Sequence, residues 1–143
     1  MNSPLDQFHA QAGALTGDVG GVILPRHYGD PSGEYRAATE GVAVIDAAFA
    51  VRLGVTGRQP AEMITGVITN SIPDLLSAPL PEVFAGASAY AALLTPKGRM
   101  LTDLHVGWVG TDAEQGLLLE LPITGAEAAL AHLGKFLPPR LAR

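Results

Sequence analysis

Three strand-like runs follow one another closely in the second half of the chain, at residues 87–95, 99–109 and 116–123. A Pro-Lys-Gly turn joins the first two, and a short polar stretch leads to the third. Antiparallel neighbours can be joined by turns this short, whereas parallel neighbours need a crossover of about a dozen residues or more. The sequence therefore predicts an antiparallel hairpin that is extended by a third strand.

Helical patterns surround these runs without regular strand–helix alternation. Helices are expected at residues 3–14, 30–41, 60–68 and 123–136. Further extended segments are expected at residues 17–24, 42–46 and 50–57. Antiparallel strands with helices packed on them are typical of the α+β class, and the 143 residues are expected to form a single domain.

Several of these expected helices carry recognisable end signals. Ser3 is placed as the N-cap of the first, and Asp30 caps the second just before Pro31. Thr124 and Glu127 have the spacing of a capping box at the start of the last helix. Residues 71–87 contain three prolines and are long for a loop, so they are expected to be functional, mobile or partly helical.

Composition excludes several classes of function. The formal charge is −5 and no extended Lys/Arg cluster occurs, which argues against nucleic acid or a polybasic membrane contact. Cysteine is absent, so disulfides, thiolate nucleophiles and cysteine metal sites are excluded. We find neither a signal-peptide pattern nor an apolar run long enough to cross a bilayer. A soluble cytoplasmic protein is expected.

Common catalytic and binding motifs are also missing. The four histidines are far apart in sequence, and no metal site is expected. Neither GxxxxGK[ST] nor GxGxxG occurs, so no phosphate-binding loop is predicted. The GxSxG motif of a serine nucleophile is absent as well.

An acid and a histidine two residues apart stand out within the second strand-like run. Because side chains alternate along a strand, Asp103 and His105 are expected on one face, about 6–7 Å apart at Cα. One interpretation is the water-facing side of a hairpin. The other is a carboxylate that faces a ligand's N–H or amine group, where burial could raise its pKa. Spacing alone leaves both open.

Two other polar residues have ordinary explanations. Asn70 is interpreted as a cap after the third helix, and Tyr90 as a core tyrosine with a satisfied hydroxyl. The run Arg26, His27 and Tyr28 is interpreted as a surface turn, with a pocket lining as the alternative.

An ordered series of landmarks nevertheless runs along the chain: Pro25, Tyr28, Glu34, Arg36, Asp46, Gly57, Thr69, Asn70, Tyr90, Gly98 and Asp103. Over roughly residues 5–136, this series resembles the N-terminal folate-binding region of the aminomethyltransferase superfamily. This superfamily includes the glycine-cleavage T-protein (GcvT) and the YgfZ-type proteins that support iron–sulfur enzymes.

The resemblance implies a tetrahydrofolate site. Asp103 matches the aspartate beside the reactive nitrogens of the folate, so it would hold the pterin and stabilise, or accept a proton from, an amine. By the same resemblance, Tyr90 and Asn70 would line the pocket, and Arg26 or Arg99 could meet the glutamate carboxylate.

Departures from the T-protein pattern favour the YgfZ type. "IDAAFA" replaces F-D-V-S-H-M, Val22 replaces a Trp, and Thr102 replaces the first acid of a pair, while "PKGRMLTD" is similar to YgfZ-type sequences. Family members continue well past 143 residues, so the chain is expected to hold an incomplete folate-binding domain.

Three functions follow from the resemblance. The first is a YgfZ-type tetrahydrofolate-binding protein that supports iron–sulfur cluster assembly or repair. The second is an aminomethyl transferase of the T-protein kind, completed by a second chain. The third is a non-catalytic fragment or interaction domain.

Overall fold

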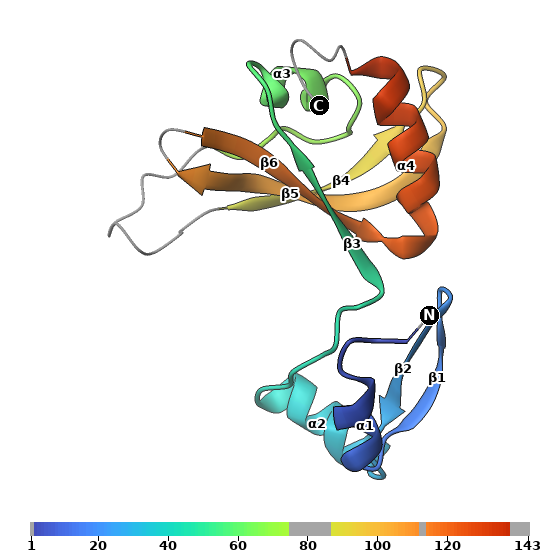
Figure 1. Ribbon diagram of the computed structural model, residues 1–143. Coiled ribbons are helices and arrows are strands. Elements are labelled where there is room, and N and C mark those ends of the chain that lie inside the picture. Colours follow the sequence, from blue (N-terminus) through green and yellow to red (C-terminus); the bar gives the residue numbers. More distant parts are fainter. Residues whose placement is uncertain (1, 75–86, 112–113, 138–143) are drawn as a thin grey trace. The chain divides into compact units, whose positions relative to one another are not determined.

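The computed structural model describes residues 2–74, 87–111 and 114–137, and the chain divides into two compact units. The N-terminal unit comprises residues 1–50 and the C-terminal unit residues 51–143. Most of the proline-containing segment at 71–87 lies outside the described residues. Figure 1 shows the helices and strands of each unit.

A hairpin forms the sheet of the N-terminal unit. Strand β1 (Leu15–Val19) pairs with the antiparallel strand β2 (Val22–His27). The two turn residues, Gly20 and Gly21, both have positive φ, at 62° and 90°. Hairpin turns of two residues with positive φ at both positions match the right-handed twist of the strands, and glycine adopts them without steric cost. The sequence predicted one extended segment here, and the structure has a hairpin.

The two helices of this unit differ in how well the sequence predicted them. Helix α2 (Pro31–Glu40) begins as predicted, because the Asp30 side chain accepts a hydrogen bond of 3.0 Å from the Gly33 N–H. Helix α1 (Asp6–Gln11) begins later than predicted, so Ser3 is not its N-cap. The Ser3 hydroxyl instead accepts from the Leu5 N–H and donates to the Asp46 carboxylate. These two bonds order the turn that precedes α1.

The predicted strand at residues 42–46 was wrong. The structure assigns no strand there, and Val42 and Val44 are 89% and 97% exposed. The segment is attached through side-chain bonds to Asp46 at its end, and not through a ladder of backbone hydrogen bonds.

A four-stranded sheet dominates the C-terminal unit. Its order is β3-β6-β5-β4, with β3 at Ala50–Val55, β4 at Ser88–Leu94, β5 at Met100–Thr111 and β6 at Glu114–Pro122. Both β4–β5 and β5–β6 are antiparallel, which confirms the predicted hairpin and third strand. Gly98, with φ of 76°, takes the left-handed position in the predicted turn.

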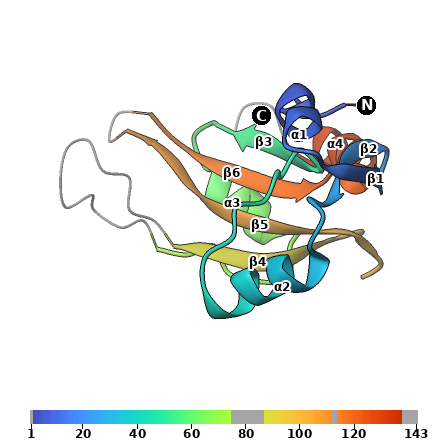
Figure 2. The ribbon, with the colours of Figure 1, turned by 90° about the horizontal axis from the view of Figure 1, so that it is seen from below.

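Two helices cover one face of this sheet. Helices α3 (Pro60–Thr65) and α4 (Ile123–Phe136) lie on the same side in both ribbon views (Figure 1 and Figure 2). The buried apolar side chains beneath them form the core: Val55, Ile64, Ala91, Leu93, Leu104, Val106, Leu117, Leu119, Leu121, Ala129 and Leu133. The structure therefore confirms the α+β prediction, with antiparallel strands and helices packed on them.

Both helices start or end differently from the sequence prediction. Strand β6 runs directly into α4, so Thr124 and Glu127 lie inside the first turns and no side chain caps the helix. Helix α3 ends at Thr65, three residues early, because the following residues bond to the outer edge of β4. The Thr69 N–H donates to the Ala92 carbonyl, and the Leu94 N–H donates to the Val67 carbonyl, both at 3.0 Å. This short segment covers backbone groups that an edge strand would otherwise expose.

Candidate functional site

Strand β5 places Asp103 and His105 on the face of the sheet opposite α3 and α4. Their neighbours Leu104 and Val106 are 1% and 0% exposed in the core, so alternation directs the two polar side chains away from it. We call this side the helix-free face, because no described helix of the C-terminal unit covers it. Asp103 is half-buried and His105 is exposed.

Tyr90 from β4 joins Asp103 on this face. The Tyr90 hydroxyl donates a hydrogen bond of 2.9 Å to Asp103 Oδ2, although its side chain is largely exposed. This bond, and the nearby negative charge of Asp103, raise the pKa of Tyr90 above its ordinary value of 10.0. No described residue donates to the second oxygen, Asp103 Oδ1. Tyr90 is 59% exposed, so the prediction that it lies in the core was wrong, whereas the prediction of a hydrogen-bonded hydroxyl was correct.

Asn70 completes the series of predicted site residues. It lies beyond the end of α3, so it is not the cap of that helix. Its Nδ2 donates to the Tyr90 carbonyl at 3.1 Å, and its Oδ1 accepts from the Ser71 N–H at 2.8 Å. The structure thus brings all three residues together, but Asn70 uses its amide to hold the Tyr90 backbone. Asp103 and Tyr90 present the groups that face outward.

A row of side chains crosses the same face and was missing from the sequence prediction. His105 pairs in register with Tyr90 on one side and with Glu120 of β6 on the other. The Tyr90 and His105 rings lie 5.1 Å apart at their centroids, with their planes tilted by 52°. Glu120 Oε2 lies 2.7 Å from Arg52 Nε of β3. The alternation of each strand places these residues on one face, but only the strand order makes them neighbours.

Thr102 explains one departure from the T-protein pattern. Its side chain is 6% exposed and points toward α4, on the opposite face from Asp103. A Cβ added to Gly125 would lie only 2.2 Å from Thr102 Oγ1, so the two elements touch here. The residue that replaces the first acid therefore does not contribute to the helix-free face.

A second polar cluster lies within the N-terminal unit, around Asp46. The carboxylate accepts hydrogen bonds from the Ser3 hydroxyl, from His9 Nε2 at 2.7 Å and from the Ala48 N–H at 2.9 Å. His9 is 4% exposed, and its Nδ1 lies 2.7 Å from the Tyr28 hydroxyl. These contacts tie together the N-terminal turn, α1, the end of β2 and the segment after α2.

The chemistry of the Asp46 cluster fixes the proton positions. A carboxylate only accepts, so His9 Nε2 carries the proton, and in the neutral ring Nδ1 accepts from the Tyr28 O–H. The hydrogen bond from Ser3, followed by the one from His9, lowers the pKa of Asp46 below its ordinary value of 3.8. Every polar group named here has a hydrogen-bond partner, so the cluster holds the unit together. The interpretation of Tyr28 as part of a surface turn missed this role.

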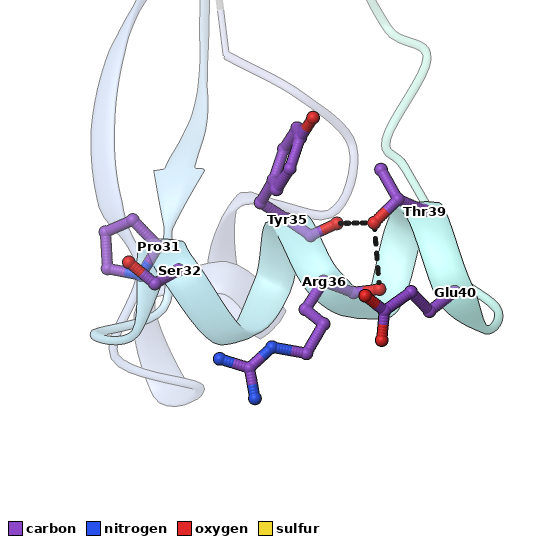
Figure 3. Close-up of a pocket in the computed structure, with 6 residues that line it drawn as sticks. All are labelled: Pro31, Ser32, Tyr35, Arg36, Thr39 and Glu40. Carbon is purple, nitrogen blue, oxygen red and sulfur yellow. Dashed lines mark hydrogen bonds between the residues drawn. The ribbon is translucent and has the colours of Figure 1, made fainter.

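A hollow of about 430 Å³ lies along α2. Pro31, Ser32, Tyr35, Arg36, Thr39 and Glu40 line it, and all of them belong to this one helix (Figure 3). Thr39 Oγ1 donates back to the carbonyls of Tyr35 and Arg36, at 3.0 and 3.2 Å. Helix α2 has no buried residue, and no second element lines the hollow. The hollow therefore lacks polar groups that converge on a common point where a ligand could bind.

The described parts of the chain lack two other features. Within residues 2–74, 87–111 and 114–137, no three His, Asp or Glu side chains are grouped so that they could hold a metal ion. None of the described helices combines the length and the apolar character needed to span a membrane.

Comparisons with known proteins point to one group. The chain is 30% identical over 106 residues to an aminomethyltransferase of Ralstonia pickettii and to one of Ralstonia nicotianae, which covers 74% of this chain. It spans only 26% of the length of these relatives. No protein-family model matches the chain.

A solved structure shows the same fold. Glycine cleavage system aminomethyltransferase T from Bartonella henselae superimposes with a TM-score of 0.73 at 20% identity. The match covers 100% of this chain and 37% of that protein. Sequence and fold together support the resemblance to the aminomethyltransferase superfamily, while none of these proteins supports the closer resemblance to the YgfZ type.

Proposed function

We propose that this chain is the N-terminal part of a folate-binding site of the aminomethyltransferase kind, with Asp103 as its central polar group. The proposal rests on the hydrogen bonding of the two Asp103 carboxylate oxygens. Tyr90 holds one oxygen, and the other receives no hydrogen bond from a described residue. A half-buried, oriented carboxylate with one open oxygen suits a ligand that offers an N–H or amine group.

The chemistry of the helix-free face fits a reduced folate. The pyrimidine ring of tetrahydrofolate is flat and the reduced pterin carries several N–H groups, and Tyr90 and His105 supply aromatic rings beside the carboxylate. Tetrahydrofolate, when bound, supplies the nitrogens that carry a one-carbon unit. Asp103 would accept a hydrogen bond from the pterin and stabilise positive charge on an amine. Tyr90 would keep the carboxylate oriented, and Asn70 would hold the Tyr90 backbone.

The choice between the functions expected from the sequence rests on the relatives. Those reported above are aminomethyltransferases, so we favour one-carbon transfer of this kind over the YgfZ-type role in iron–sulfur cluster assembly or repair. The relatives are about four times as long as the part that matches. We therefore propose that a second polypeptide segment supplies the remainder of the site, and that transfer requires it.

Calorimetric titration with 5-formyltetrahydrofolate tests the proposal. We expect saturable binding by the wild-type chain, and Asp103→Ala should weaken it at least tenfold because it removes the charged acceptor. Asp18→Ala is the matched control, since Asp18 is an exposed acid in the β1–β2 hairpin and bonds only locally to the Gly21 N–H. Circular dichroism verifies that each variant is folded.

The same titration separates the rival functions. Equal binding by the wild-type and Asp103→Ala chains would refute the assignment of the site. A folded wild-type chain that releases no heat would favour the third function, an interaction domain or a fragment without folate binding of its own.

A further inference from the structure

The proposed function uses the ring of His105 but not its ability to carry a charge. It follows Asp103 by two residues on β5, so both side chains project from the helix-free face. Its side chain is exposed, and its ring lies against the Tyr90 ring at 5.1 Å. Tyr90 in turn donates to Asp103, so His105 touches the residue that orients the carboxylate.

The two carboxylates near His105 differ in whether they have a cationic partner. It faces Tyr90 on β4 and Glu120 on β6, with Asp103 as its neighbour on β5 itself. The Glu120 carboxylate already has a cationic partner, because Arg52 of β3 lies 2.7 Å from it. Asp103 makes no ion pair with any described residue. When His105 is protonated, Asp103 is therefore the neighbouring carboxylate whose charge is not yet balanced.

Histidine ordinarily changes its charge between pH 5 and 8. An imidazolium beside Asp103 offsets the negative charge of the carboxylate, whereas a neutral ring leaves that charge to the ligand and still packs against Tyr90. Binding should therefore strengthen as the pH rises through the range in which histidine loses its charge.

We infer that His105 is a positioning residue of the Asp103–Tyr90 site, and that its neutral form is the one that favours ligands with N–H or amine donors. This inference rests on the proposed function and adds a regulation of the same site by pH. Exposed pairs of opposite charge typically change an equilibrium by up to about fivefold. We therefore expect about threefold tighter binding of 5-formyltetrahydrofolate at pH 7.5 than at pH 5.5.

Two substitutions separate the charge of His105 from its other properties. His105→Gln keeps a polar side chain, and His105→Phe keeps a ring beside Tyr90, but neither can be protonated. His27→Gln is the control, because His27 lies in the N-terminal unit and its Nδ1 accepts only a local bond from the Gly29 N–H. Since His105 is exposed, both substitutions should leave the sheet folded, which circular dichroism verifies at each pH.

The experiment is a titration with 5-formyltetrahydrofolate at pH 5.5, 6.5, 7.5 and 8.5. The inference predicts that both His105 variants lose the threefold change while the His27 control retains it. If the His105 variants keep the same pH dependence as the wild type, the inference is overturned and the proposed function stands. If the wild-type chain binds at no pH, the proposed function fails and the inference fails with it.

Discussion

Replacing the buried Asp46 carboxylate with an amide should strongly lower the stability of the N-terminal unit. Asp46→Asn keeps the shape of the side chain but removes the charge and one acceptor oxygen. Three donors converge on the carboxylate: the Ser3 hydroxyl, His9 Nε2 and the Ala48 N–H. The Asn amide has one oxygen, so its NH₂ group must face at least one of these donors.

The cost follows from the hydrogen bonds that are lost. Losing a hydrogen bond to a charged group and leaving its donor unsatisfied costs about 2–3 kcal/mol. The Asp46 side chain is only 9% exposed, so water cannot replace the missing acceptor easily. With an m-value of about 1–2 kcal/mol per molar urea for a small unit, the unfolding midpoint should fall by about 1–3 M.

Urea unfolding followed by far-UV circular dichroism measures this change. The chain has a single tryptophan, Trp108 on β5, so its fluorescence reports the C-terminal unit separately. Asp18→Asn is the matched control, because an exposed Asn can still accept the bond from the Gly21 N–H. A midpoint for Asp46→Asn equal to that of this control would refute the claim that the Asp46 cluster holds the unit together.

The stability that Asp46 contributes should decrease in acid. The pKa of Asp46 is lowered in the folded chain by its hydrogen bonds from Ser3 and His9. Its stabilisation is therefore complete above the ordinary value of 3.8 and is lost as the pH falls through the lowered value. The stability difference between the wild type and Asp46→Asn should shrink in acid, as the pH falls through the lowered pKa.

Two further predictions concern the C-terminal unit. Gly125→Ala should destabilise the C-terminal unit by about 1–3 kcal/mol in urea unfolding, because the added methyl group meets Thr102. Gly134→Ala in the same helix adds a methyl group with no atom within 4 Å, so it should stabilise the unit by about 0.5–1 kcal/mol. Equal effects of the two substitutions would contradict the packing of Gly125 against Thr102. In an alkaline titration of tyrosinate absorbance, Asp103→Asn should move one of the three tyrosines to lower pH, since Asp103 raises the pKa of Tyr90. An unchanged titration would mean that the bond between them does not persist in solution.

The sequence predicted the parts of the fold that depend on near neighbours. The Pro-Lys-Gly turn and the alternating runs around it give β4, β5 and β6 with their antiparallel pairing. The position of β3 beside β6 could not be predicted, because no short connection joins them. For the same reason the predicted strand at 42–46 was wrong, since a strand-like composition does not supply a partner strand.

The candidate site was predictable to a similar extent. Strand alternation placed Asp103 and His105 on one face, but the positions of α3 and α4 decide which face is covered. Glu120 and Arg52 joined the row only once the strand order was known. The Asp46 cluster gave no signal from the residues alone, because Ser3 and His9 lie 43 and 37 positions away in the sequence.

The central claim is that a reduced folate binds at Asp103 on the helix-free face. Backbone amide NMR spectra recorded during a titration of the ¹⁵N-labelled chain with 5-formyltetrahydrofolate test both the binding and its location. If the folate binds there, saturable shifts should centre on Tyr90, Asp103 and His105 and be absent in Asp103→Ala. Shifts confined to residues 2–50, or no shifts in a folded chain, would contradict it.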